Sequence, residues 1–150
     1  MAWYQTPTGW LNLDRVWVIE ISSTWTVSLY LAANVVDSDN NDGQAVFTLG
    51  PYDSQADAQA TVEEITQLHG GQWVFAGAGF GQYYNAAYIY QLLVSGSGTQ
   101  WFTQAFINSG VAQSSGFSDG PTLTQYTSES DANNGLAALM QQLSIVNAGD

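Results

Sequence analysis

One stretch occurs twice in this chain: TLGPYDSQADA at residues 48–58 returns as TLTQYTSESDA at residues 122–132. The offset from position 48 to position 122 is close to half of the chain length of 150 residues. With Gln67 and Gln141 added, seven of the twenty positions from 48 to 67 are identical without a gap. The pattern predicts two copies of one supersecondary unit, and repeated units more often build shape and surface than a catalytic centre.

Each copy is predicted to contain three antiparallel strands. Residues 16–22 and 25–31 are rich in β-branched and aromatic side chains, and Ser23-Thr24 forms a tight turn between them. Asp42-Gly43 is a strong turn pair before a third strand at 44–49. The matching strands of the second copy are expected at residues 88–94, 100–107 and 122–126.

A helix follows the third strand in each copy. Ser54 is the expected N-cap, and an apolar stripe at every third or fourth residue follows it up to Gly70-Gly71, which ends the helix. Ser128 repeats the cap, and a second stripe repeats the first. Each unit is therefore expected to be βββα.

The resulting fold class is α+β: two tandem βββα repeats, with antiparallel sheets that each carry one helix. We expect one domain, residues 1–150, with repeats at about 10–71 and about 84–146 sharing one core, because half of the chain would be marginal alone. The joining segment 72–83 is apolar and contains glycines, which indicates packed backbone, either an added strand or a close crossing of the halves. The two sheets could be continuous or packed back to back.

Composition limits the function. There are 13 carboxylates against one cation, Arg15, giving a net charge of −12. Direct binding to nucleic acid, to an anionic membrane or to a phosphorylated ligand would need cations that the chain lacks. Six Trp, eight Tyr and six Phe exceed what a core this size requires, and such rings are enriched where one protein covers another.

The sequence predicts neither a disulfide nor a targeting segment. Cysteine is absent, so thiolate metal sites are excluded as well. Residues 1–7, MAWYQTP, carry neither a basic start nor an apolar core, so no secretion signal is expected. No apolar run approaches the roughly 20 residues that span a bilayer. We therefore expect synthesis as a soluble chain in the cytoplasm, without export.

No residue pattern predicts catalysis or a cofactor. His69, the single histidine, lies at a predicted helix end, where it complements the helix dipole. Glu63 and Glu64 are adjacent, so they point apart and form no acid/base pair. Glu20 interrupts an apolar strand, and Arg15, a partner chain or solvent could satisfy it.

Two loops resemble ligand sites in part. Asp37, Asp39 and Asn41 have the spacing of the first ligands of a calcium loop, but Asp42 and Thr48 replace the required Gly and Glu, so a solvated loop is the better interpretation and no metal is predicted. The glycines of residues 77–81 fit neither the dinucleotide fingerprint nor the P-loop, which favours close packing.

A resemblance to known proteins also indicates where the chain comes from. The pattern W-x-N-L-D-x-V at residues 10–16, followed by a hairpin and a Tyr-Asp-Ser helix start at residues 52–54, is similar to small uncharacterised proteins of tailed phages and bacteria. The likeness covers the first half of the chain, as far as about Gly70, and implies a fold without a shared catalytic motif. The second half keeps the helix start and lacks the Asn-Leu-Asp opening, so a role tied to that opening would belong to the first half alone.

These observations lead to a non-enzymatic hypothesis: a structural virion protein, most simply a capsid decoration or stabilising protein present in many copies. Its partners would be the major capsid protein or further copies of itself as a homo-oligomer. The expected anchors are ring side chains, namely Trp3, Tyr4, Trp10, Trp73, Tyr83 and Tyr84. The alternative is an acidic intracellular inhibitor that mimics DNA and binds a host nuclease or DNA-binding protein.

Overall fold

The computed structural model describes residues 2–7, 9–32, 46–76, 81–108 and 120–143. The elements up to residue 69 are β1 (Trp3–Thr6), β2 (Gly9–Asn12), the 3₁₀ turn η1 (Leu13–Arg15), β3 (Val16–Ile21), β4 (Val27–Leu31), β5 (Val46–Leu49) and α1 (Gln55–His69). Those that follow are β6 (Trp73–Ala76), β7 (Gln82–Asn85), the 3₁₀ turn η2 (Ala86–Tyr88), β8 (Ile89–Ser97), β9 (Gln100–Ile107), β10 (Thr122–Tyr126) and α2 (Glu129–Gln142). The α+β class is confirmed.

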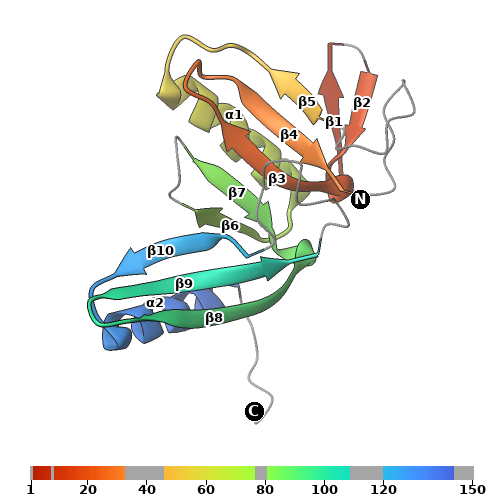
Figure 1. Cartoon of the computed structure of the whole chain (residues 1–150). Helices are drawn as coiled ribbons and strands as arrows, with labels where there is room; N and C mark the ends of the chain where they lie inside the picture. Colours follow the sequence, from red (N-terminus) through yellow and green to blue (C-terminus); the bar gives the residue numbers. More distant parts are fainter. Residues whose placement is uncertain (1, 8, 33–45, 77–80, 109–119, 144–150) are drawn as a thin grey trace.

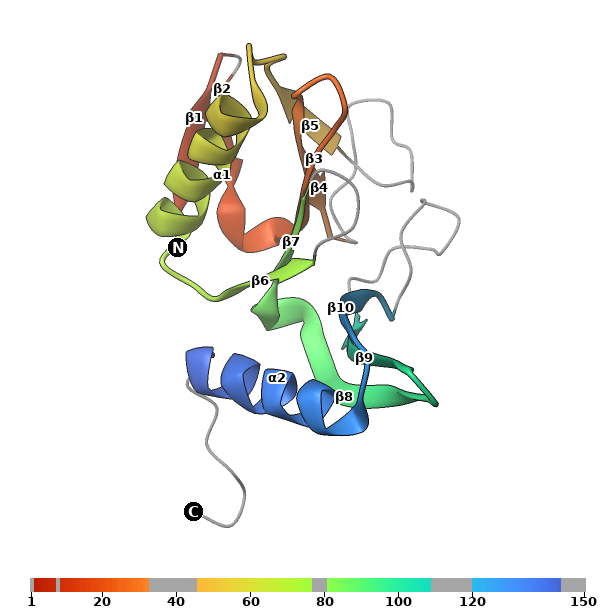
Figure 2. The same ribbon diagram turned by 90° about the vertical axis from the view of Figure 1, so that its left-hand side faces the viewer.

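The described strands form three antiparallel sheets rather than one continuous sheet (Figure 1). One has five strands in the order β5-β4-β3-β7-β6, one has three in the order β10-β9-β8, and β1 and β2 pair as a separate ribbon. Helix α1 packs on the five-stranded sheet and α2 on the three-stranded sheet (Figure 2). Strand β10 contacts β6, so the two larger sheets meet there.

The described residues of segment 72–83 are mainly strand. They include β6 and the start of β7, which pair with each other, and β7 also pairs with β3. The segment therefore adds a two-stranded hairpin to the first sheet, which is one of the two possibilities that its composition allowed. Residues 77–80 lie outside the described part.

Local signals placed the helices correctly. The Ser54 hydroxyl accepts a hydrogen bond from the Asp57 backbone N–H at 3.2 Å, and Ser128 does the same for Asp131 at 3.1 Å. Gly70 ends α1 in the left-handed region with φ 72°, where glycine has no Cβ to clash. Both predicted N-caps and the C-terminal glycine are confirmed.

Two hydrophobic clusters share β3. The first lies between α1 and the five-stranded sheet, and the second lies on the opposite face of β3, against β6, β7, β9 and β10. Strand β3 is therefore buried on both faces, whereas β4 alternates between buried and half-buried residues. The second cluster consists of Trp17, Val18, Ala32, Val74, Ala76, Tyr84, Ala105, Ile107 and Leu123.

The same turn leads into the first long strand of each half. At Asn12 (φ −81°, ψ 106°) the side chain accepts a hydrogen bond from the Asp14 N–H at 3.0 Å. At Asn85 (φ −72°, ψ 117°) it accepts one from the Ala87 N–H, also at 3.0 Å. The second half therefore has the asparagine turn, although it lacks the Leu-Asp side chains that follow the asparagine in the first half.

A register shift follows each turn at the same distance. In the β3–β4 pairing it lies between Val16 and Val18, and in the β8–β9 pairing between Ile89 and Gln91. Each bulge leaves one aromatic residue, Trp17 or Tyr90, between two paired positions.

Candidate interaction surfaces

The β1–β2 ribbon presents two tryptophans on its outer face. Gln5 is paired with Trp10, and Trp3 lies two residues from Gln5, so the two indoles share a face. Trp3 is 48% and Trp10 is 65% exposed. On the inner face, Tyr4 and Leu11 pack against the first core cluster. The ribbon therefore has one face bound to its own molecule and one aromatic face open to solvent.

The other predicted anchors are less accessible. Tyr4 is half-buried, and burial, with the charge of Glu64, raises its pKa. The half-buried Trp73 lies at a ring distance of 5.4 Å from His69. Tyr83, also half-buried, lies 5.1 Å from the Phe75 ring.

Tyr84 is the exception among the six predicted anchors. It is 1% exposed and belongs to the second core cluster, so it offers a partner no contact area. Its ring packs 6.2 Å from that of Trp17. Tyr84 is therefore a core residue, and a pattern of consecutive aromatics could not reveal this because Tyr83 and Tyr84 point to opposite faces of β7.

Two exposed rings escaped the sequence-based selection. Tyr90 on β8 is 67% exposed and Phe75 on β6 is 54% exposed. Tyr90 lies beside Phe106 on the neighbouring strand, with ring centroids 6.3 Å apart. Tyr90 follows Trp17 at a separation one position shorter than the offset between the two repeated stretches. This spacing could have identified Tyr90 as the counterpart of Trp17.

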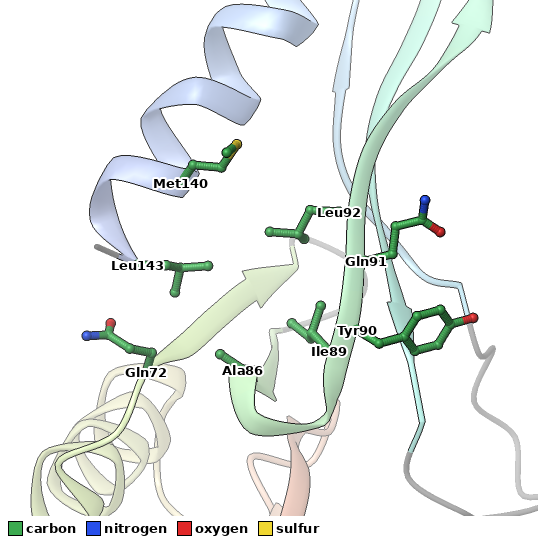
Figure 3. A pocket seen from close by; sticks show the side chains of 8 residues that line it. All are labelled: Gln72, Ala86, Ile89, Tyr90, Gln91, Leu92, Met140 and Leu143. Atoms are coloured by element: carbon green, nitrogen blue, oxygen red, sulfur yellow. The ribbon is translucent and has the colours of Figure 1, made fainter. Parts of the chain in front are cut away.

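An apolar pocket of about 370 Å³ lies between β8 and α2. In Figure 3 the side chains of Leu92 and Ile89 extend from β8 toward Met140 and Leu143 on the helix side. Its lining residues are Gln72, Ala86, Ile89, Tyr90, Gln91, Leu92, Met140 and Leu143. The pocket can receive an apolar side chain, but it contains no charged lining residue that would orient a polar ligand.

A second pocket, of about 520 Å³, lies where the two larger sheets meet. Side chains from α1, β6 and β7 line one side, and β9, β10 and α2 line the other. The indole Nε1 of Trp73, one of the lining residues, is buried without a hydrogen-bond partner. This pocket separates the halves only in part, since β10 contacts β6 directly.

His69 is held at both ring nitrogens. Nε2 lies 3.0 Å from Asp14 Oδ1, and Nδ1 accepts a hydrogen bond from the Gly71 N–H at 3.2 Å. Since Nδ1 is an acceptor there, Nε2 carries the proton and donates to Asp14. Neither nitrogen is free to accept a substrate proton, so the imidazole links the end of α1 to η1. Sequence analysis gave His69 no partner, because Asp14 is 55 residues away.

Glu20 finds its partner on the added hairpin. Gln82 Nε2 donates to Glu20 Oε2 at 2.9 Å, and the Tyr84 hydroxyl donates to Gln82 Oε1 at 2.9 Å. Burial, with the charge of Glu20, raises the pKa of Tyr84 to about 12. This chain of contacts fixes β7 against β3 and replaces the Arg15 pairing that the sequence left open.

Several expectations fall outside the described residues. The candidate calcium-loop residues Asp37, Asp39 and Asn41 lie outside the described residues, and so do Gly77 and Gly79 of the glycine-containing segment. Elsewhere in the described chain, no three His, Cys, Asp or Glu side chains gather as a metal site would require. None of the described helices has the length and apolar character to cross a membrane.

Comparisons with protein-family models, with curated proteins and with solved structures returned no match.

Proposed function

We propose that this chain is a structural subunit of a phage particle, a capsid decoration or stabilising protein that works through protein–protein contacts. The observation that carries the proposal is the outer face of the β1–β2 ribbon, where Trp3 and Trp10 share one face and are both exposed to solvent. Large exposed indoles are costly to leave in water and are frequent among residues that dominate protein interfaces. The phage-like opening at residues 10–16 supports the source.

We further propose that the chain arose by duplication of one unit, a hairpin followed by a 3₁₀ turn, three strands and a helix. The order β1-β2-η1-β3-β4-β5-α1 is followed by β6-β7-η2-β8-β9-β10-α2. The asparagine caps, the bulges and the serine caps recur in the same order. In this scheme the units start at the hairpins, so residues 72–83 belong to the second unit rather than to a linker.

The alternative, an inhibitor that mimics DNA, receives less support. A mimic needs carboxylates spaced like phosphates along one face, whereas Glu64 acts on Tyr4 and Glu63 acts on Tyr83, which belong to different hairpins. Glu129 is carried by the other helix. These three carboxylates therefore do not follow one another along a single row, although the net charge of −12 suits a basic partner.

The experiment is quantitative mass spectrometry of purified particles from cells that express the chain and produce the phage. The proposal expects copy numbers comparable with the major capsid protein. Particles grown with the Trp3→Ser/Trp10→Ser double variant should retain less of the chain. Those grown with Val46→Ser, which removes another exposed apolar side chain, this time from β5, should retain it fully. Absence of the chain from purified particles would overturn the proposal.

A further inference from the structure

The two long strands that follow the 3₁₀ turns differ in what covers their outer edge. Strand β3 pairs with β4 on one side and with β7 on the other, through Val18↔Tyr84, Ile19↔Tyr83 and Glu20↔Gln82. Strand β8 pairs with β9, and no other described strand pairs with it. An edge nine residues long that no described strand covers offers a template for another strand.

The residues at the two bulges differ in exposure in the same way as the two strand edges. Trp17 of β3 is 3% exposed, packed against Tyr84 of the covering hairpin. Tyr90, at the matching position of β8, is 67% exposed. Each strand thus carries a large ring at its bulge, and only the ring of β3 is covered by a hairpin.

The described part of the chain also contains a hairpin, β1–β2, that does not pair with either of the larger sheets. The hairpin β6–β7 extends the five-stranded sheet, whereas β1 and β2 pair only with each other among the described strands. When Asn12 is aligned with Asn85, Trp10 matches Tyr83 and Leu11 matches Tyr84. The exposed face with Trp3 and Trp10 corresponds to the face of β6–β7 that carries Tyr83.

We propose that the β1–β2 ribbon of one molecule docks on the β8 edge of a second copy of this chain and completes a five-stranded sheet in the order β10-β9-β8-β2-β1. The inference rests on the proposed protein–protein role and names its partner. The covered β3 edge in the same chain supplies the model for the contact, so β2 would pair antiparallel to β8 near Gln91, Leu92 and Leu93, which match Val18, Ile19 and Glu20.

The apolar pocket fits this occupant. Ile19 and Tyr83 are paired and face α1, and both belong to or pack against the first cluster. Leu92, which matches Ile19, lines the pocket together with Met140 of α2. In the docked arrangement Trp10 takes the place of Tyr83 and enters the pocket of about 370 Å³ between β8 and α2. An indole then covers apolar side chains that otherwise face water.

The contact joins two different surfaces, so it is head-to-tail. Each molecule has one ribbon and one β8 edge, and association therefore continues into a ring or a filament instead of stopping at a two-fold dimer. Both surfaces are nearly free of charge: the ribbon carries no acidic or basic side chain, and none lines the pocket. We expect association to change little with salt.

The test uses sedimentation velocity on the full chain at concentrations up to about 1 mM, where weak contacts are populated. A head variant, Trp3→Ser/Trp10→Ser, removes the indoles, and a tail variant, Tyr90→Glu/Met140→Glu, places carboxylates at the β8 pocket. Val46→Glu is the control, because it puts a carboxylate on β5, another exposed edge strand in the described sheets. Thermal unfolding checks that each variant folds, and Tyr90→Ser/Met140→Gln replaces the tail variant if it does not.

The wild type and Val46→Glu should form species larger than dimers, and each blocked variant should associate at least about tenfold more weakly. An equimolar mixture of head and tail variants should give a complex of two chains and nothing larger, because one intact ribbon meets one intact edge. A monomeric wild type, a mixture that stays monomeric, or loss of association in Val46→Glu would each overturn the inference. A capsid-bound chain that is monomeric when purified would still leave the virion proposal standing.

Discussion

The buried hydroxyl of Tyr84 gives stability a pH dependence that can be measured. Burial comes first among the causes that raise its pKa, and the nearby Glu20 charge adds to it, so that the folded value is about 12 against 10.0 for the free side chain. A raised pKa of a neutral acid means that the folded state holds the proton more tightly than the unfolded state. The contribution is fully present below pH 10 and is lost as pH rises toward 12.

The size of this pH-dependent contribution to stability follows from the pKa shift of Tyr84. Two pKa units correspond to about 2.7 kcal/mol, of which about 2 kcal/mol is lost between pH 9 and 11.5. Tyr84→Phe cannot ionise and escapes this loss. At pH 9 it should be less stable than the wild type by about 1 kcal/mol, because Gln82 Oε1 loses the hydroxyl that donates to it at 2.9 Å. By pH 11.5 the order should reverse.

The assay is urea unfolding of both proteins at intervals from pH 9 to 11.5, followed by circular dichroism. Other half-buried tyrosines also lose stability in this range, but they do so in both proteins and cancel in the difference. Val62→Ala is the control, because it lowers stability without removing an ionisable group and should leave the wild-type slope unchanged. Parallel curves for the wild type and Tyr84→Phe would refute the reasoning.

Three further predictions concern the fold. Ser54→Ala and Ser128→Ala should each cost about 1 kcal/mol in urea unfolding, because each hydroxyl accepts a helix N–H; no effect from either would contradict the cap. Gly96→Ala should lower the melting temperature more than Gly98→Ala: both have positive φ, but a Cβ at Gly96 would collide with the backbone of the facing strand, whereas at Gly98 it would meet open space. Val62→Ala should cost about 2 kcal/mol, since the side chain is 1% exposed, and a cost below about 0.5 kcal/mol would place it outside the core.

The hydrogen bond between His69 and Asp14 shows what could and could not be predicted from the sequence. The histidine was correctly placed at a helix end, because Gly70-Gly71 and the apolar stripe are local signals. Its partner lies on η1, and no pattern in a single sequence connects positions 55 residues apart. The same limit applies to Glu20, which the sequence could pair with Arg15 or solvent and the structure pairs with Gln82.

The hairpins show the limit most clearly. Periodicity and caps along the chain decided that strands, turns and helices would form, since those signals act between residues a few positions apart. Whether a hairpin lies against a neighbouring sheet was decided only by tertiary contacts. Tyr84 of β7 is buried because β3 lies beside that strand, whereas β2 pairs only with β1 among the described strands and its Trp10 is 65% exposed. The burial of a residue depends on which distant segment of the chain packs against its strand. The sequence of the strand itself does not specify that segment.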